Sequence, residues 1–294
     1  MALGVLGDLE ASERAYDWLA THQLGEGAWF NYYRAGTVDN PRLDSNVSAY
    51  VAVGVHHFAE LVDDVATWRR WWPMVERALD FAVSLQRRDG TVAWARDASG
   101  RLERDALVTG CSSLLHSLEC GVALARQLDA STTHWSEALV RLRRALERSE
   151  LFADKSQFAM DWYYPALSGA LAPAAAEARL RLGEGTFVRE GEGVRCVSTS
   201  EWVTAAETAE CALAWALVGH RDRARDLLEC TRRHRLADGS YLTGLVEPGG
   251  VSFPAGERTT YSAAAVVLAD DALYETSSVR RSFRPGLGES LEDA

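Results

Sequence analysis

The segment QLGEGAW, Gln23–Trp29, has the pattern Q-x-x-x-G-x-W and directly follows a helical stretch. A second copy is QRRDGTVAW, Gln86–Trp94, and a third version is HRLADGSY, His234–Tyr241. Each copy comes at the end of a presumed outer helix, and its glycine can adopt the left-handed conformation that stops a helix. A motif that staples one helix after another predicts an all-α protein made of repeated units, and it indicates fold rather than chemistry.

Helical periodicity dominates the rest of the chain and predicts helices at 8–23, 44–61, 66–87, 105–128, 132–149, 165–182, 201–218, 220–234 and 259–275. Some are apolar nearly all round, namely 47–58, 109–125, 204–218 and 259–269. Others are Arg-rich with one polar face, namely 68–87, 133–150 and 221–235. This alternation is typical of an α/α toroid, in which inner helices surround an axis and outer helices pack around them. We therefore expect an all-α fold, an α/α toroid of about five to six helical hairpins, of the terpenoid cyclase and six-hairpin glycosidase type.

Composition sets the domain and partner expectations. No linker divides the 294 residues, so we expect a single α/α-toroid domain over 1–275 and a polar C-terminal tail over 276–294. The stretch 182–197, which is rich in glycine over 183–193, is interpreted as a short hairpin or a mobile loop near the cavity. With 31 basic and 42 acidic residues, the net charge of −11 argues against nucleic acid or an anionic membrane surface as the main partner.

The same sequence favours a cytoplasmic location. The N-terminal residues do not resemble a signal peptide, and no run approaches the roughly 18 apolar residues of a membrane helix. The five cysteines have no CxxC spacing, which indicates reduced thiols rather than a disulfide framework. The oligomeric state is left open.

An acidic residue lies at or before the expected start of each apolar segment: Asp44, Asp105, Asp161, Glu201 and Glu257. In a toroid the inner helices begin at the same end, so we expect these acids to ring one cavity mouth. Taken alone, each acid could be a helix cap, and that is the favoured interpretation of Asp105. Asp44 and Glu257 stand in less ordinary contexts, because Asp44 follows an aromatic loop and Glu257 lies in the turn VSFPAGER.

Aromatic residues in a cleft beside paired carboxyl groups are typical of enzymes that hydrolyse glycosidic bonds. Aromatic rings stack on the C–H faces of pyranoses, while one carboxyl group protonates the leaving oxygen and the other activates water or attacks the anomeric carbon. We predict Asp44 and Glu257 as this pair. Arg258 beside Glu257 favours Glu257 as the base and Asp44 as the acid without settling the assignment. The predicted substrate-binding residues are Trp29, Tyr32, Tyr33, Asn46, Asp161, Trp162, Tyr163, Tyr164, Glu201, Trp202, Tyr241 and Arg258.

Other chemistries have weaker support. A terpene cyclase or prenyltransferase relative fits the toroid motif, but Asp63-Asp64 and Asp270-Asp271 lack the first aspartate of the D-x-D-D proton donor. Cysteine and histidine spacings do not match a zinc site, so we expect neither a metal nor an organic cofactor. A non-catalytic glycan-binding protein is the third hypothesis, for which the carboxylates would be dispensable.

Several segments resemble known families. The Q-x-x-x-G-x-W copies resemble the QW motif of squalene–hopene cyclases and prenyltransferase-like toroid proteins. DWYYP (161–165), FPAGERTTYSAA (253–264) and DSNVSAY (44–50) resemble actinobacterial proteins labelled prenyltransferase-like, and with them the mycobacterial methylmannose polysaccharide hydrolases, endomannosidases with an α/α-barrel.

The resemblance spans most of residues 20–275. It implies endo-cleavage of a cytosolic α-1,4-linked, 3-O-methylated mannose polysaccharide, with Asp44 and Glu257 as the matching catalytic acids. Toroid hydrolases resemble the inverting pattern, so inversion of the anomeric centre is expected.

Overall fold

The computed structural model describes residues 1–62 and 64–284. Its contacts form two compact units, each with its own hydrophobic core. Unit 1 comprises residues 1–7 and 155–283, and unit 2 comprises residues 8–154 together with Arg284. The single α/α-toroid domain over 1–275 stays a prediction.

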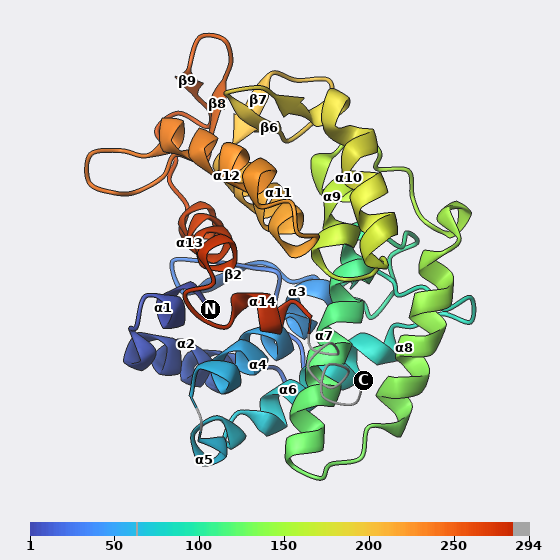
Figure 1. Ribbon diagram of the computed structural model, residues 1–294. Coiled ribbons are helices and arrows are strands. Elements are labelled where there is room, and N and C mark those ends of the chain that lie inside the picture. The colour runs from blue at the N-terminus through green and yellow to red at the C-terminus, as the bar shows by residue number, and fades with distance from the viewer. Residues whose placement is uncertain (63, 285–294) are drawn as a thin grey trace, which may run out of the picture. The chain divides into compact units, whose positions relative to one another are not determined.

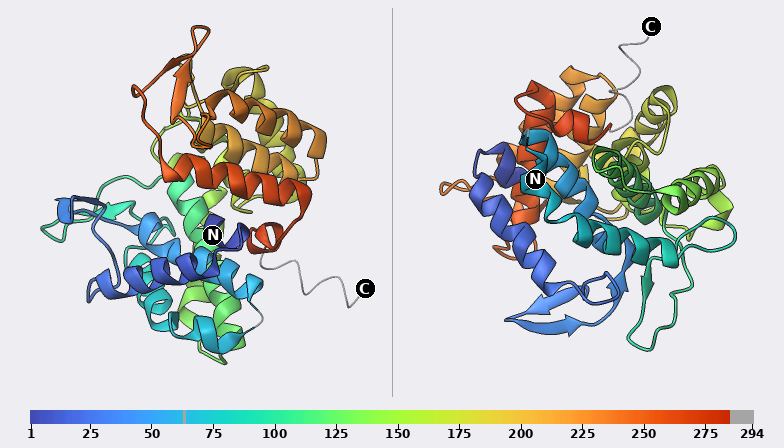
Figure 2. Two further views of the ribbon diagram at one scale, coloured as in Figure 1. Left: turned by 90° about the vertical axis from the view of Figure 1, so that its left-hand side faces the viewer. Right: turned by 90° about the horizontal axis from the view of Figure 1, so that it is seen from below.

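Unit 2 is mainly helical, and its buried and half-buried helices alternate as expected. α4 and α7 are buried on most sides, whereas α2 and α8 bury one narrow face. The β1–β2 hairpin projects from the helices of this unit (Figure 2, right), and β3 pairs with β4. The elements are α2 (Leu9–His22), β1 (Tyr32–Arg34), β2 (Thr37–Asn40), β3 (Leu43–Asp44), α3 (Ser45–Ala49), α4 (Val51–Leu61), α5 (Val65–Arg69), α6 (Trp72–Ser84), β4 (Ala95–Arg96), α7 (Val108–Gln127), α8 (Thr133–Leu146) and the 3-10 helix η1 (Ser149–Leu151).

Unit 1 combines helices with a small antiparallel sheet in the order β5-β6-β7-β8-β9. The apolar helix α11 packs against α9, α12 and α13, which surround it in Figure 1. The elements are α1 (Ala2–Val5), α9 (Ala159–Leu167), α10 (Pro173–Phe187), β5 (Val188–Arg189), β6 (Gly193–Arg195), β7 (Trp202–Thr204), α11 (Ala205–Leu217), α12 (Arg221–Cys230), the 3-10 helix η2 (Thr231–His234), β8 (Gly244–Val246), β9 (Val251–Ser252), α13 (Thr260–Tyr274) and α14 (Val279–Ser282).

Two sequence expectations in unit 1 were wrong in detail. The helix expected at 165–182 is two helices, α9 and α10, separated by a turn in which Gly169 has φ +74°. The hairpin expected within 182–197 is present as β5–β6, but it starts later, because α10 continues through Gly183 and Gly185. A five-stranded sheet was not anticipated, since strands of two or three residues are too short to show a period-2 pattern.

The repeated motif fixes each loop to the next outer helix of unit 2. The Gln23 amide donates to the backbone oxygens of Gly27 (2.8 Å) and Met74 (2.9 Å), and its Oε1 accepts from Arg77 Nε at 3.0 Å. In the second copy the Gln86 amide donates to Gly90 O (3.0 Å) and Ala138 O (2.9 Å), and its Oε1 accepts from Arg141 Nε at 3.0 Å. The two copies are therefore one structural repeat.

The glycines of these copies do not cap the helices, contrary to the expectation from sequence. α2 ends at His22 and α6 at Ser84, and the glycine closes a turn further along, where its N–H donates to the backbone oxygen three residues earlier. Gly90 has φ +92° and lies against the backbone of Arg141, so the position requires both a left-handed conformation and the absence of a side chain.

Two further segments differ from expectation. By length and composition α7 could cross a membrane, but 67% of its most apolar window is buried, and its place in the core of unit 2 accounts for its sequence. Within the expected polar tail 276–294, α14 places Val279 and Phe283 in the core of unit 1, and Asp271 accepts hydrogen bonds from Thr276 Oγ1 and Val279 N. Residues 285–294 of that tail, and Asp63, lie outside the described residues.

Candidate active site

Asp44 is held at the start of α3 in unit 2. Its backbone pairs with Ala95 in the β3–β4 ladder, and its Oδ1 accepts the Val47 N–H at 3.0 Å as the N-cap. The next residue, Ser45, is buried and donates its N–H to Trp94 O at 3.0 Å. The second copy of the motif thus leads directly to the residue that follows Asp44, so the repeat fixes the position of the predicted acid.

The surroundings of Asp44 favour its protonated form. Desolvation raises the pKa of its carboxyl group, and the N–H groups of Val47 and Asn46 oppose this only in part. The enclosed Oδ1 of Asn46 has no hydrogen-bond partner within residues 1–62 and 64–284. An acceptor left unsatisfied beside a half-buried carboxyl group is available to a ligand hydroxyl.

The aromatic loop before Asp44 divides into a buried and an exposed part. Trp29 is 7% exposed and donates its indole N–H to Leu19 O at 3.0 Å, which is a core role. Tyr32 and Tyr33 on β1 are exposed, so their side chains are open to a ligand. Substrate contact by any of the three stays a prediction.

Glu257 lies just before α13 in unit 1, in the turn that the sequence singled out. The Thr243 hydroxyl donates to Glu257 Oε2 at 2.8 Å, and the Thr243 N–H donates to Glu257 O at 2.9 Å. The N–H of Ala205, the first residue of α11, donates to Thr243 O at 3.1 Å. Thr243 therefore ties an exposed carboxyl group to the start of a buried helix, which fixes its orientation while leaving it open to solvent.

The neighbours of Glu257 are arranged differently from the expectation. Arg258 Nη1 lies 2.9 Å from Asp238 Oδ2, so its ion pair is with Asp238 and not with Glu257. The positive charge of Arg258 therefore no longer supports the assignment of Glu257 as the base. Trp202 on β7 is half-buried and donates its indole N–H to Phe253 O at 2.8 Å, so it supports the turn that carries Glu257.

The DWYYP segment forms the first turns of α9, so Asp161 lies inside a helix and does not precede one. Trp162 is 6% exposed and donates its indole N–H to Arg179 O at 2.8 Å. Tyr163 is fully buried and Tyr164 is nearly so. These positions favour packing roles, and a substrate role for them stays a prediction.

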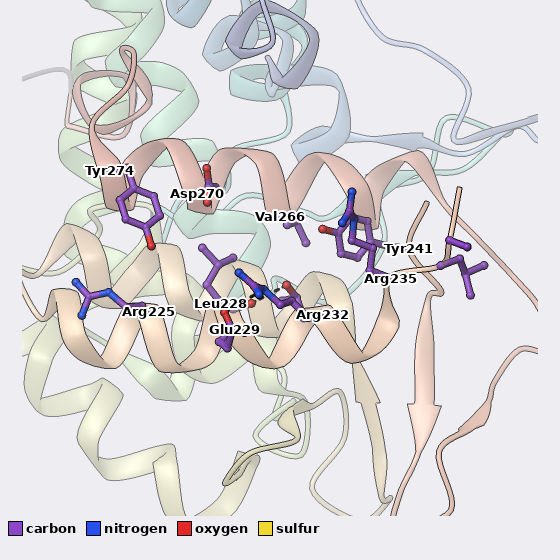
Figure 3. Close-up of a pocket in the computed structure, with 12 residues that line it drawn as sticks. Arg225, Leu228, Glu229, Arg232, Arg235, Tyr241, Val266, Asp270 and Tyr274 are labelled. Carbon is purple, nitrogen blue, oxygen red and sulfur yellow. Dashed lines mark hydrogen bonds and ion pairs between the residues drawn. The ribbon is translucent and has the colours of Figure 1, made fainter. Parts of the chain in front are cut away.

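Two more predicted site residues of unit 1 lie away from the Glu257 turn, with Glu201 in ion pairs and Tyr241 at a cavity. Glu201 precedes the strand β7 and forms ion pairs with Arg189 and Arg195, which hold the pKa of its carboxyl group below the ordinary value. Tyr241 lines a cavity of about 610 Å³ between α12 and α13, which Figure 3 shows with Tyr274 at the other end.

Sequence reasoning missed a second carboxyl cluster in unit 1. Glu210 on α11 accepts the hydroxyl protons of Tyr163 and Tyr261, each at 2.5 Å. The pKa of Glu210 is raised to about 7, chiefly by desolvation and to a smaller extent by Glu207, while hydrogen bonds from the Tyr163 and Tyr261 hydroxyls act in the opposite direction. The available signal was the pair of glutamates in the otherwise apolar helix AAETAECALAWAL. Such acids inside an apolar helix are costly unless they are paired.

Across residues 1–62 and 64–284, no group of three or more His, Cys, Asp or Glu side chains is placed to hold a metal ion. No disulfide bond joins any of the five cysteines.

Comparisons with known proteins identify the fold and the family. No family model matches the sequence. The chain has the fold of a GH63 mannosylglycerate hydrolase from Thermus thermophilus (TM-score 0.64, 12% identity, 93% of this chain and 90% of that one). It also matches a cellobiose 2-epimerase from Bacillus thermoamylovorans B4167 (TM-score 0.66, 10% identity, 97% and 85%). The predicted α/α-toroid class is confirmed.

A relative from Mycolicibacterium hassiacum carries the name MMP endo-(1,4)-3-O-methyl-alpha-D-mannosidase. It is 42% identical to this chain over 285 residues, which are 97% of this chain and 79% of the relative. Identity of this extent confirms the expectation of a glycoside hydrolase. The chain belongs to the family of that endomannosidase.

Proposed function

We propose that this protein is an endo-acting glycoside hydrolase that cleaves an α-1,4-linked, 3-O-methylated mannose polysaccharide. The observation that carries the proposal is the 42% identity to the named endomannosidase over nearly the whole chain. Two carboxyl groups, each held by its own hydrogen bonds at a helix start, supply the chemistry that such a cleavage needs.

In the proposed mechanism Asp44 is the general acid. Burial raises the pKa of its carboxyl group, which is the direction that a general acid needs, and its proton goes to the oxygen of the scissile bond, which departs as a sugar hydroxyl. The proton sits on a carboxyl group whose orientation is set by the Val47 N–H. Because Asp44 is deprotonated when that proton is delivered, the N–H donors of α3 then stabilise its charged form.

Glu257 is proposed as the general base. Its carboxyl group is exposed and accepts a hydrogen bond from Thr243 on Oε2, which leaves Oε1 to take a proton from water. The water attacks the anomeric carbon from the face opposite the leaving oxygen and inverts it. This reaction needs the two carboxyl groups about 6.5–9.5 Å apart, against about 5–5.5 Å for retention.

Product analysis tests the proposed activity. The purified protein is incubated with an α-1,4-linked 3-O-methylmannose polysaccharide, and the products are measured by mass spectrometry and by proton NMR during the first turnovers. We expect oligosaccharides before monosaccharides, with the new reducing ends first appearing as the β-anomer. Intact polysaccharide after prolonged incubation contradicts the proposal, whereas initial α-anomer contradicts inversion alone.

The alternatives give different results in the same experiment. A glycan-binding protein would retain the polysaccharide without cleaving it. A polyprenyl-diphosphate enzyme would convert that substrate instead, but its candidate aspartate Asp271 is buried and caps the segment before α14, which favours a structural role.

The proposal also covers the location of the protein in the cell and its main binding partner. We propose a cytoplasmic protein, which the five free cysteines support, since oxidising compartments favour disulfides. The net charge of −11 supports a neutral polysaccharide, and not nucleic acid or an anionic membrane surface, as the main partner.

A further inference from the structure

Three helices of unit 1 converge on a carboxyl group that the proposed acid–base pair does not use. Glu210 on α11 accepts the Tyr163 hydroxyl of α9 on Oε2 and the Tyr261 hydroxyl of α13 on Oε1, both at 2.5 Å. A separation of 2.5 Å lies at the short end of the range for O–H···O hydrogen bonds. Both tyrosines are therefore committed as donors to Glu210.

The two tyrosines differ in what they show to solvent. Tyr163 is 0% exposed, whereas Tyr261 is 52% exposed. Because the hydroxyl proton of Tyr261 points to Glu210, its phenolic oxygen keeps a lone pair for another donor. The exposed half of the side chain offers an aromatic face, and the remaining lone pair of the bound hydroxyl can accept one further hydrogen bond.

Tyr261 belongs to the same short segment as the proposed base. It lies four residues after Glu257, in the first turn of α13. Thr259 caps that turn by accepting the Ser262 N–H at 3.1 Å, so the start of the helix is fixed. A fixed helix start and a bound hydroxyl together give the phenol a defined orientation.

Building on the proposed glycosidase function, we propose that Tyr261 is a substrate-binding residue whose phenolic oxygen accepts a hydrogen bond from a free hydroxyl of the sugar bound beside Glu257. Glu210 is its positioning residue. A methyl ether has no proton to donate, so this position selects a free hydroxyl over an O-methyl group.

Binding measurements test this without depending on turnover. In a Glu257→Gln background, calorimetry measures the affinity for an α-1,4-linked 3-O-methylmannose oligosaccharide. We expect Tyr261→Phe to weaken binding about 5- to 10-fold, the effect of one lost hydrogen bond. The matched control is Tyr274→Phe, the same change on the same helix at a side chain 51% exposed, which we expect to have no effect.

A double-mutant cycle isolates the role of Glu210. Glu210→Gln places an amide beside the phenol that can itself donate to the phenolic oxygen, so we expect about 3-fold weaker binding. In the Tyr261→Phe background the same substitution should have no further effect, because Glu210 acts through Tyr261. Two independent, additive effects overturn the positioning role.

A fully O-methylated oligosaccharide of the same length supplies the specificity readout. It has no hydroxyl donor along its length, so the penalty of Tyr261→Phe should disappear with it. A penalty that persists, or one shared by Tyr274→Phe, overturns the assignment of Tyr261.

The outcomes separate this inference from the proposed function. Binding by the wild-type protein without cleavage contradicts the hydrolase proposal, and Tyr261 is then judged on its binding penalty alone. Cleavage by the wild-type protein with equal affinities for the Tyr261→Phe and Tyr274→Phe variants overturns only the Tyr261 assignment. No binding by the Glu257→Gln protein overturns the Tyr261 assignment, and it overturns both proposals when the wild-type protein also fails to cleave the polysaccharide.

Discussion

Asp44 shows how one residue can be both a helix cap and a candidate acid. A cap accepts an N–H, which favours the charged carboxylate, while burial favours the neutral acid. At Asp44 burial is the larger effect, and the pKa is raised. The sequence presented these two interpretations as alternatives. The structure shows the cap, and the raised pKa supports the acid role, which stays a prediction.

The orientation of Glu257 by Thr243 is testable with two threonines. Thr243→Val removes the hydroxyl that donates to Glu257 Oε2 and keeps the side-chain shape. We expect kcat to fall about 10-fold with little change in Tm, because a hydrogen bond to a charged group is lost. The matched control, Thr276→Val, removes a hydroxyl that donates to the buried Asp271 away from the proposed site, so stability should fall by about 1 kcal/mol with kcat nearly unchanged. Equal losses of kcat in both variants would falsify the orienting role.

The raised pKa of Glu210 makes stability depend on pH. The folded protein keeps this proton up to about pH 7, whereas the unfolded chain loses it near the ordinary value of 4.5. Between those values the folded state binds more protons, so the free energy of unfolding falls as pH rises. The Glu210→Gln variant has no such titration. Between pH 4.5 and pH 8 we therefore expect its free energy of unfolding to rise by about 1–3 kcal/mol relative to that of the wild-type protein. Urea unfolding of both proteins at pH 4.5 and pH 8 measures this change. If the difference in unfolding free energy between the two proteins is the same at both pH values, the prediction is contradicted.

The sequence predicted the positions of Asp44 and Glu257 along the chain better than those of Asp161 and Glu201, and it did not predict the burial of the aromatic residues. The catalytic roles of Asp44 and Glu257 stay predictions. Asp44 and Glu257 lie at helix starts, where the sequence placed them. Trp29 and Trp162 are buried with their indole N–H groups bonded to backbone oxygens. An aromatic residue near a loop serves equally well as cleft wall or core, because burial is decided by neighbours far away in the chain.

At the scale of elements, the repeated motif was the most informative pattern. In both copies in unit 2 the glutamine amide donates to the glycine of its own motif and to a backbone oxygen of the next outer helix. A side-chain amide can thus bridge a turn and a helix at once. The boundary between α9 and α10 was not predictable from periodicity. Pro165 lies inside α9 and Pro173 starts α10, so proline alone did not mark the break.

The glycine of the second copy gives an element-scale prediction. Gly90→Ala places a methyl group 2.5 Å from Arg141 O at φ +92°, so we expect a loss of about 2–4 kcal/mol in stability. Gly100→Ala has a similar φ of +85° with nothing within 4 Å, and should lose only about 1 kcal/mol. Denaturant unfolding compares the two. A loss at Gly90 no larger than at Gly100 would mean that this loop is not packed against α8.

At the scale of the whole molecule, fold class followed from alternating helix burial, which needs no exact boundaries. The division of contacts into two units did not follow from it, because no linker marks the change at residues 154–155. Asp44 belongs to unit 2 and Glu257 to unit 1. The single toroid domain over 1–275, in which both acids serve one site, is therefore our proposal for the whole chain.

The most direct test of that claim is the turnover of Asp44→Asn and Glu257→Gln on the 3-O-methylmannose polysaccharide, with Tm measured in parallel. Asparagine still caps α3 and glutamine still accepts from Thr243, so both variants should fold normally. We predict that each loses about 100- to 10,000-fold in kcat with Tm nearly unchanged. Near wild-type turnover in either variant would contradict the account.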